Sequence, residues 1–486
     1  MRSFVTPDTE APGAVDFGGA VRRLSLPQPL LRWTALAGVL LGVAYTASPT
    51  SIWFAVFAGS LVVWAGRDLT PRERRWVWGL LGLALALRLL AIVALFLLTS
   101  SDLELVGSIL PDGRYLKLRS LWIRNVALGI PIHWYDNVEA FHPYARSGSH
   151  YLLAAFQLAL GPMTYGIHLL NTAFFTTGAV ILYRTVRSAF GGVPALVGLA
   201  IILFLPTLFV WSISALKDPL FFFLTSVCLA SAFAGLRTKA WSRRALAFVT
   251  CAAAIASAGT LRQTGLIILG GGLLTGLALR FIVLKARVMV ACAVLFMLAT
   301  SYVAVSPAAQ ERILGPVRLA GAFHYGFTNT PGENYKLLDQ HFYATHLRAR
   351  RLIEEMTSPE SGRFIIRTAV SFVSTPLPWT ASSPAAVAFI PQQMFWYLLV
   401  GLAVIGCYVG FWRDRLLTCI LTGTVILGAA TVAFITGNVG TLVRFRDMVV
   451  PLVAWLSGLG ACTVIEQVAR FHGCVRGGET PASVER

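Results

Sequence analysis

Long apolar runs separated by short basic clusters constrain this chain more than any other feature of its sequence. A helix needs about 20 mainly apolar residues to cross the hydrocarbon core of a bilayer. By that criterion the sequence predicts about twelve transmembrane helices. They are expected near residues 30–48, 51–66, 76–99, 163–187, 193–211, 218–236, 245–260, 264–284, 287–305, 393–411, 416–436 and 448–467.

The composition excludes an ordinary soluble protein, because 56% of the residues are hydrophobic and only 13% are charged. The formal net charge of +18 does not point to nucleic acid. Many basic residues stand in short clusters between apolar runs, where such residues set membrane topology and contact anionic headgroups. We therefore predict an all-α polytopic membrane protein whose partners include membrane lipids and do not include nucleic acid.

The basic clusters also predict the orientation of the chain in the membrane. They fall on one side of the predicted spans, and the positive-inside rule makes that side the cytoplasm. Both terminal segments, 1–29 and 468–486, lie on it. Function should be sought in the segments left on the far side, which are 100–162, 212–217, 260–263, 306–392 and 437–447.

The first of these segments, 100–162, is expected to contain helices outside the membrane. Leu118, Trp122 and Val126 recur at helical spacing, which indicates an amphipathic helix lying on the membrane surface. The apolar stretch from Tyr151 to Leu160 is too short to span and indicates a second interfacial helix.

The longest of them, 306–392, is predicted to hold one helix, from about Leu337 to Met356. Arginine and glutamate residues stand four positions apart on that helix, and we interpret them as solvated pairs.

Asp112 is the candidate catalytic residue. It opens the sequence Asp112-Gly113-Arg114-Tyr115 beyond the third predicted span, on the far side from the cytoplasm. A carboxylate beside the membrane at that place is a candidate base for chemistry on a lipid-borne substrate. Asp is also a favoured N-cap, so Asp112 is equally well placed to cap the surface helix that follows. Position alone leaves both interpretations open.

Further ionisable residues stand at the far-side ends of other predicted spans. Ionisable groups at such depth are costly to bury and usually line a cavity or a substrate path. One base among several cations suits transfer from a phosphate-bearing donor. The residues are Lys217, Asp218, Arg262, Arg444, Arg446 and Asp447.

Some of these residues also have a structural interpretation. Asp218 precedes Pro219, which is typical of a helix start, so an N-cap role is favoured for Asp218. Arg262 can extend its side chain to lipid headgroups, as an Arg at any helix end can. For Lys217 a structural ion network and a substrate role both stay open.

Arg444 and Arg446 flank Phe445 on the non-cytoplasmic side, against the positive-inside bias, and this favours a functional role for them. We predict unequal roles for these two arginines. We expect Arg444 to bind a donor phosphate and Arg446 to pair with a protein carboxylate.

Metal-dependent and nucleotide-dependent chemistry has little support in the motifs. Neither G-x-x-x-x-G-K-[ST] nor H-E-x-x-H occurs, which disfavours an ATP-driven pump and a zinc protease. Six histidines fall in the far-side segments, and none shows a tight metal-ligand spacing. Surface or hydrogen-bonding roles are expected for His133, His142, His150, His324, His341 and His346.

The order of several short motifs resembles the C-type (GT-C) superfamily of integral-membrane glycosyltransferases, in particular its bacterial dolichyl-phosphate-mannose protein mannosyltransferase-like branch. The resemblance covers roughly residues 76–467, and each motif alone is loose. The motifs are the internal Arg88 of the third span; Asp112-Gly113-Arg114-Tyr115; Gly161-Pro162; the span ending Tyr183-Arg184-Thr185-Val186-Arg187-Ser188-Ala189-Phe190-Gly191; Leu205-Pro206 with Trp211-Ser212; Leu216-Lys217-Asp218-Pro219-Leu220; and Gly440-Thr441-Leu442-Val443-Arg444-Phe445-Arg446.

The resemblance implies a division of the chain. Residues 76–305 would form the catalytic transmembrane module, with its extracytoplasmic loop at 100–162. Residues 306–392 would form a large extracytoplasmic loop and 393–467 the C-terminal transmembrane helices. The two spans within 30–75 precede the usual module, and we assign them no chemistry.

The resemblance also implies an activity. The donor sugar would be carried on a polyprenyl phosphate, and a catalytic aspartate in the first extracytoplasmic loop, here Asp112, would be the general base. Lys217, Arg262 and Arg444, with Arg446 beside them, would bind the donor phosphate. Metal use varies among such enzymes, so a divalent metal stays open and no other cofactor is implied.

Many of these enzymes carry a paired acid directly after the first span of the module, whereas Asp112 is followed by Gly113. A second acid therefore has several candidates, namely Asp102, Glu104, Asp136 and Glu139. The expected acceptor is a hydroxyl on a lipid-linked or glycan-linked molecule at the extracytoplasmic face of the inner membrane. A glycan polymerase or ligase using polyprenyl-linked glycans is the alternative among enzymes, and a lipid or solute transporter is the alternative from another class.

Overall fold

The computed structural model describes residues 32–39, 42, 49–98, 112–142, 148–162, 165–329, 333–344, 354, 356–380 and 384–477. The chain forms two compact units, residues 1–53 and 54–486. Of the first unit, the structure describes the helical residues 32–39 and 42 and the start of α3. The functional candidates all belong to the second unit.

The described residues are almost entirely helical and contain no β-strand, only an isolated bridge between Asn334 and Asn438. The elements in chain order are α3 (Pro49–Ala65), α4 (Pro71–Leu98), α6 (Asp112–Ala127), α7 (Trp134–Phe141), α8 (Gly148–Leu160), α9 (Gly166–Phe190), α10 (Gly192–Phe204), α11 (Pro206–Ile213), α12 (Asp218–Arg237), α13 (Trp241–Leu261), α14 (Gln263–Leu266), the π-helical segment η3 (Ile267–Gly271), α15 (Gly272–Leu284), α16 (Ala286–Val305), α17 (Pro307–Thr328), α18 (Gln340–Ala344), α20 (Ser358–Ser374), the 3₁₀ turn η4 (Pro378–Thr380), α21 (Pro384–Arg413), α22 (Arg415–Ile435), α23 (Val439–Arg446) and α24 (Val450–Gly477).

Nine helices in the described part of the chain are long and apolar enough to cross a membrane. This confirms the prediction of a helical, multi-pass membrane protein. The nine are α4, α9, α12, α13, the stretch Gln263–Leu284, α16, α21, α22 and α24. The predicted span 51–66 corresponds to the shorter apolar helix α3, and most of 30–48 lies outside the described residues. The total of twelve stays a prediction.

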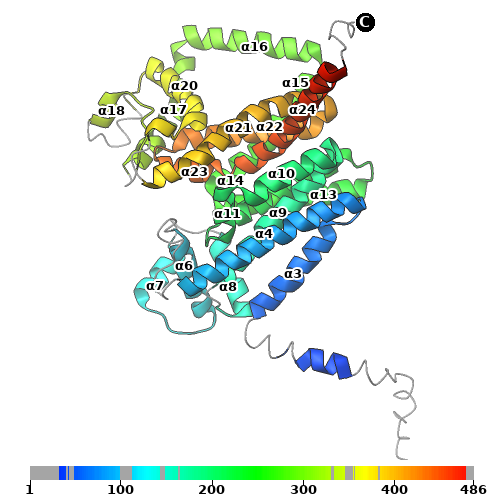
Figure 1. Cartoon of the computed structure of the whole chain (residues 1–486). Helices are drawn as coiled ribbons and strands as arrows, with labels where there is room; N and C mark the ends of the chain where they lie inside the picture. The colour runs from blue at the N-terminus through cyan, green and yellow to red at the C-terminus, as the bar shows by residue number, and fades with distance from the viewer. Residues whose placement is uncertain are drawn as a thin grey trace, which may run out of the picture. The chain divides into compact units, whose positions relative to one another are not determined.

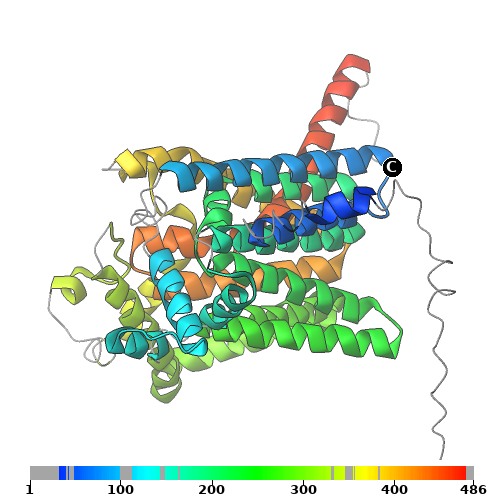
Figure 2. The ribbon, with the colours of Figure 1, turned by 90° about the horizontal axis from the view of Figure 1, so that it is seen from below.

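Within the second unit the long helices run side by side, and α6, α7 and α18 lie at the same end of the bundle (Figures 1 and 2). We call this end the loop end. The opposite end is tied by ion pairs between helices: Glu73 accepts two hydrogen bonds from Arg187, at 2.7 and 2.9 Å, and Arg237 pairs with Asp414.

The predicted span 193–211 is broken. Leu205 separates α10 from α11, and the two helices meet at 62°. Pro206 has no N–H group, so the helical ladder is interrupted here. Inside a membrane each freed backbone group needs a partner within the protein. The Leu203 carbonyl accepts from Arg88 at 2.9 Å, and Thr207 N donates to Gln392 at 3.2 Å.

Arg88, the internal arginine of the third predicted span, therefore has a structural role at this break. Its side chain is fully buried and also donates to Ser212 at 2.7 Å and to the Ala84 carbonyl at 3.1 Å. The guanidinium lies 5.2 Å from the Phe175 ring centre and 5.0 Å from that of Phe209. Rings and neutral acceptors, rather than a carboxylate, surround this cation.

The large loop differs from the prediction. Leu337 to Asp339 are not helical, and helix is found only at Gln340–Ala344 and at Glu354 among the described residues of 337–356. The backbone N–H groups of Leu337 and Leu338 donate to the Tyr343 hydroxyl at 3.0 Å, and that of Asp339 donates to Glu360 at 2.8 Å. Side chains thus satisfy these donors and hold the segment out of helical geometry.

Two longer helices of this loop, α17 and α20, were not predicted, although each begins with an ordinary start signal. Ser306 accepts a hydrogen bond from Ala309 N and is followed by Pro307, and Thr357 accepts from Glu360 N at the start of α20. A Ser or Thr N-cap with Pro at the first turn is a common helix start.

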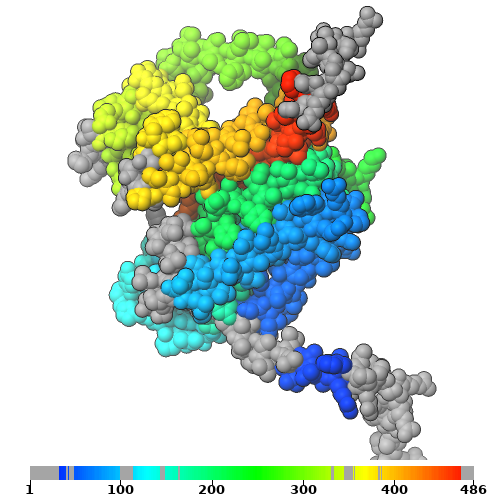
Figure 3. Space-filling view, in the orientation of Figure 1, coloured from blue at the N-terminus to red at the C-terminus, as the bar shows by residue number. Residues whose placement is uncertain are grey.

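Helix α16 stands apart from the other spans. None of its described residues is buried, and an opening separates its middle from the helices beside it in the space-filling view (Figure 3). Helix α16 is therefore held mainly through its two ends, where it joins α15 and α17.

The tightest contact between spans is made by glycines. A Cβ atom on Gly406 of α21 would lie 1.8 Å from the Leu456 carbonyl oxygen of α24, and one on Gly460 would lie 2.0 Å from that of Leu402. Without side chains at these positions the two backbones approach closely, as small residues allow in membrane bundles.

Gly406→Ala should therefore destabilise the protein by about 1–3 kcal/mol or more, because the added methyl group forces α21 away from α24. Gly401→Ala is the matched control on the same helix, since nothing lies within 4 Å of the position its Cβ would take. Melting curves of the purified variants in one detergent make the comparison. Equal melting temperatures for the two variants would contradict the close packing.

Candidate anion-binding site

Asp218 is the centre of a charged cluster at the loop end. Its carboxylate is completely buried, pairs with Arg262 through one oxygen and accepts from Arg444 at 3.3 Å through the other. Arg262 is 44 positions from Asp218 in the sequence and Arg444 is 226 positions away. The fold thus assembles this site from three distant segments.

The start of α12 explains where Asp218 lies. Pro219 occupies the first turn, and Asp218 is the first helical residue rather than the cap, so the N-cap interpretation of Asp218 is wrong. The residue in the cap position is Lys217, which makes no side-chain capping bond. An acid in the first turn is favoured by the helix dipole, which adds to the attraction of the two arginines.

Arg262 is the single extended residue between α13 and α14, with φ −148° and ψ 135°. Gly265 makes this break possible, because a Cβ atom there would lie 2.5 Å from the Ala258 carbonyl oxygen. The Arg262 side chain is nearly buried and lies over the Phe445 ring, 4.6 Å from its centre. It therefore points into the protein, and the headgroup interpretation of Arg262 is wrong.

Lys217 ends an irregular segment whose backbone is held by side chains of α9. Asn171 donates to the carbonyls of Ser214 and Leu216 at 2.6 and 2.8 Å. His168 Nδ1 lies 2.6 Å from the Ile213 carbonyl oxygen. Lys217 itself donates to the Leu261 carbonyl at 2.9 Å, next to Arg262. The Lys217 ammonium thus lies beside the turn that carries Arg262.

Arg444 and Arg446 take different directions from α23, as expected for residues two apart on a helix. Arg444 contacts Asp218, whereas Arg446 donates to Gln393 at 3.0 Å and to the Thr375 carbonyl. We expected Arg446 to be the one paired with a carboxylate, and this was wrong: in the described structure that partner belongs to Arg444. The structure does not bring Arg446 into the Asp218 cluster.

Asp447, which follows α23, is a second buried carboxyl group near the cluster. It accepts from the Thr207 hydroxyl at 3.0 Å, at the bend between α10 and α11. Burial raises the pKa of Asp447 to about 8, against the opposing effects of Thr207 and Arg446. Asp447 is therefore mostly protonated at neutral pH. The negative charge of Asp218 also contributes to the raised pKa of Asp447.

Asp112 is the first residue of α6, and the structure does not describe its side chain. One turn later, Leu116 lines a pocket together with Lys217 and Leu220. The first turn of α6 therefore lies next to the start of α12. Helix α8 fixes this position from the other side, because Gly148 at its start packs directly on Thr260.

The packing of α6 was only partly predicted. The structure has a helix at each of the two predicted places, α6 and α8, and their position on the membrane surface stays a prediction. The face of α6 that is buried in the protein consists of Gly113, Leu116, Arg119 and Ser120, whereas the apolar stripe predicted to face the membrane is half-buried or exposed. Arg119 donates to the carbonyls of Glu139 and His142, so polar contacts hold α6 to the segment around α7.

Of the four predicted second acids, the two that the structure describes, Asp136 and Glu139, have no described contact with the Asp218 cluster. Asp102 and Glu104 lie outside the described residues. Asp136 is in the first turn of α7, and Glu139 accepts from the Tyr115 hydroxyl at 3.2 Å within the surface helices. The fold instead brings Asp218 and Asp447 to the site. The sequence had singled out both as ionisable residues near this end, but it predicted a cap for Asp218 and no separate role for Asp447, because it does not display their burial.

The described side chains do not form a set of metal ligands at this site. In the part of the chain that the structure describes, no three His, Cys, Asp or Glu side chains are grouped so as to hold a metal ion. His324, one of the candidate histidines, is buried instead, with Nδ1 3.0 Å from the Thr436 carbonyl oxygen. Burial lowers its pKa to about 4, so it is neutral at physiological pH.

The charge of the cluster determines what it can bind. Lys217, Arg262 and Arg444 carry three positive charges and Asp218 carries one negative charge, which leaves two positive charges in a largely buried place. Arg forks and a Lys ammonium are the side chains that bind phosphate most readily. The described cluster is therefore suited to an anionic ligand.

Comparisons with known proteins add no relative. The chain matches no protein-family model, and it has no significant similarity to a curated protein or to a solved structure.

Asp218→Asn should destabilise the protein by about 3–5 kcal/mol, because it removes the anion that two buried arginines share. Asp68→Asn is the matched control: Asp68 pairs with Arg184 at 3.2 Å, but its side chain is 84% exposed. Exposed pairs contribute little to stability, so its melting curve should be nearly that of the wild type. A loss of stability no larger for Asp218→Asn than for Asp68→Asn would show that Asp218 does not hold the cluster.

Proposed function

We propose that this chain is an integral-membrane glycosyltransferase of the C-type class. It transfers a sugar from a polyprenyl-phosphate-linked donor to an acceptor hydroxyl on a lipid or glycan, at the extracytoplasmic face of the inner membrane. The observation that carries the proposal is the convergence of Lys217, Arg262 and Arg444 at one end of the bundle, beside the first turn of α6.

The proposed reaction is a single displacement with inversion. The acceptor oxygen forms a bond to the anomeric carbon as the bond from that carbon to the donor phosphate oxygen breaks. Asp112 takes the proton of the acceptor hydroxyl, and the electron pair of the broken bond stays on the phosphate. Lys217, Arg262 and Arg444 stabilise the negative charge that grows there.

Asp218 has a different role in this scheme. It touches no substrate and positions the two guanidinium groups, since each of its oxygens contacts one of them. Arg446 is no longer assigned to the phosphate, because its described partners are Gln393 and the Thr375 carbonyl. No step of the scheme depends on a metal.

The membrane arrangement belongs to the same proposal. Twelve spans with both termini in the cytoplasm would place the loop end outside. The nine described spans, the bent pair α10–α11 and α3 are consistent with that arrangement. A glycan polymerase or ligase would use the same cations and the same side of the membrane, so it remains the alternative among enzymes.

A transporter is favoured by one specific observation, the bent span α10–α11, because broken helices are frequent in transporters. Here, however, the groups freed at the break are bonded to Arg88 and Gln392. The break is therefore closed by protein side chains. Flux of labelled lipid or sugar through proteoliposomes, without turnover, would favour the transporter.

Asp112→Asn tests the base. The amide keeps the shape and much of the N-cap capacity but removes the basic carboxylate. We expect a folded protein whose release of polyprenyl phosphate from a panel of polyprenyl-phosphate sugars falls by roughly 10² or more. Turnover close to wild type in the purified variant would remove Asp112 from the mechanism and leave it a cap.

Two substitutions of Arg444 test the proposed phosphate site. Arg444→Lys keeps the charge but loses the two-bond fork, and Arg444→Ala loses both. Binding of a polyprenyl phosphate in nanodiscs should weaken moderately in the first variant and by about tenfold or more in the second. Arg184→Ala is the control, because Arg184 pairs with exposed Asp68. If both Arg444 variants bind normally but melt early, Arg444 is structural.

A further inference from the structure

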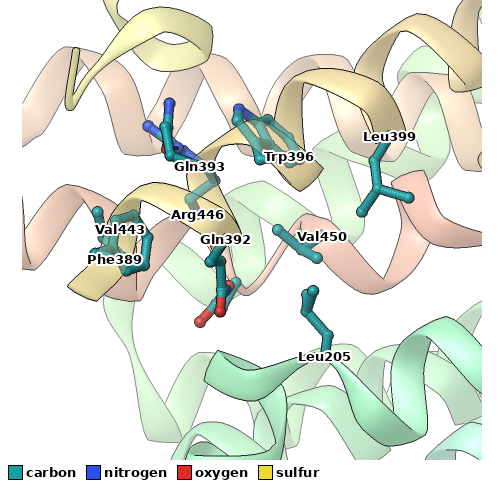
Figure 4. Close-up of a pocket in the computed structure, with 10 residues that line it drawn as sticks. Leu205, Phe389, Gln392, Gln393, Trp396, Leu399, Val443, Arg446 and Val450 are labelled. Atoms are coloured by element: carbon teal, nitrogen blue, oxygen red, sulfur yellow. Dashed lines mark hydrogen bonds between the residues drawn. The ribbon is translucent and has the colours of Figure 1, made fainter. Parts of the chain in front are cut away.

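A second pocket borders the end of α23, where Val443, Arg446 and Asp447 line it (Figure 4). Four polar side chains line part of it, Gln392 and Gln393 of α21 with Arg446 and Asp447. Phe389 and Trp396 contribute apolar wall, and the free space inside is little more than water-sized. Of these residues, only Arg446 and Asp447 were singled out from the sequence.

Most hydrogen-bonding groups around this pocket already have partners. Gln392 is bonded to Thr207 through both ends of its amide. Gln393 accepts from Arg446 at 3.0 Å and donates to the Val373 carbonyl at 3.3 Å. One oxygen of Asp447 accepts from Thr207. These bonds fix the polar wall in place.

Two buried side-chain atoms of the residues described around this pocket have no hydrogen-bond partner. They are the second carboxyl oxygen of Asp447, Oδ2, and the Nε atom of Arg446. Both residues are 3% exposed. A buried polar atom without a partner is costly, and in native proteins it usually marks a place that water or a ligand completes.

The charges limit what can complete it. A cation is disfavoured by the charge of Arg446, and an anion is disfavoured because Arg446 already donates to Gln393 and to the Thr375 carbonyl. Neither reason applies to a neutral group that can both donate and accept a hydrogen bond. A hydroxyl group has this property, and it suits Asp447 in either protonation state.

We propose that this pocket is a subsite for one hydroxyl group of a sugar ring, with Asp447 Oδ2 as its partner and Phe389 beside the C–H face of the ring. The inference rests on the proposed glycosyl transfer and deepens it. The space admits a hydroxyl or hydroxymethyl group rather than a whole ring. A site built to bond a hydroxyl discriminates strongly against a ligand that lacks it.

The position of the pocket suits this role. Phe389 and Gln393 also line an adjoining pocket bounded by Glu333 and by the segment from Pro376 to Thr380. A ligand can thus be approached from the large loop, while Arg444, three residues before Asp447, reaches the phosphate cluster. The hydroxyl belongs either to the donor sugar or to an acceptor glycan.

The test compares ligands that differ by one hydroxyl. The probes are farnesyl phosphate without sugar, its gluco-, manno- and galactosides, and the monodeoxy analogues of each, with free oligosaccharides and their deoxy analogues as the acceptor series. Binding is measured in nanodiscs for the wild type, Asp447→Leu and Val443→Phe. Val443 lines the pocket, so the second variant fills it without changing the carboxyl group.

We expect the wild type to bind one deoxy analogue about tenfold or more weakly than its parent. Both variants should lose that discrimination and still bind sugar-free farnesyl phosphate. Val404→Phe, at a position 67% exposed on α21, should keep it. Discrimination confined to the donor series assigns the hydroxyl to the donor, and discrimination confined to the acceptor series assigns it to the acceptor.

The proposal is overturned if the wild type discriminates in neither series, or if both pocket variants discriminate as the wild type does. The pocket would then hold only a structural water. Melting curves show whether Asp447→Leu still folds, and Val443→Phe carries the test if it does not. Failure of the proposed function looks different, because farnesyl phosphate itself would then bind independently of Arg444.

Discussion

The site depends on side chains that form hydrogen bonds with the backbone N–H and C=O groups left free where helices break at the loop end of the bundle. Unpaired N–H and C=O groups are costly away from water, so each break in a helix needs a side chain to complete it. Side chains of Arg88 and Gln392 form hydrogen bonds with the free backbone groups at the Leu205 break, and Asn171 does so for the segment before Lys217. Because these breaks are held rigidly, they can present charged side chains at defined positions.

Asp218 balances the buried positive charge of the cluster, because it pairs with both Arg262 and Arg444. Two buried arginines would repel each other and lose their hydration, and a carboxylate between them offsets both costs. The single negative charge of Asp218 does not neutralise the cluster, because the described cluster has three positive charges, on Lys217, Arg262 and Arg444. The protein thus keeps a cationic place beside the membrane at a cost in stability, which is common where a site must receive an anion.

Helix α23 links this cluster with the pocket that Gln392, Gln393, Arg446 and Asp447 line. Asn438 caps its start by accepting from Thr441 N at 3.2 Å, and the large loop is joined to the same turn where Val439 N donates to the Glu333 carbonyl at 2.9 Å. Arg444 leaves the helix toward α12, and Arg446 leaves it toward α20 and α21. A movement of the large loop would therefore reach both places through one short helix.

What the sequence determined by itself is the class and the inventory of candidates. Runs of apolar residues specify spans because the bilayer has a fixed thickness, and the surface helix from Asp112 followed from its spacing. Lys217, Arg262 and Arg444 were singled out since charge at that depth is costly. Only the tertiary structure decided that they meet around Asp218, that Arg446 turns away, and that Asp447 is buried beside Thr207. Those outcomes depend on contacts between residues up to 240 positions apart, which local patterns do not encode.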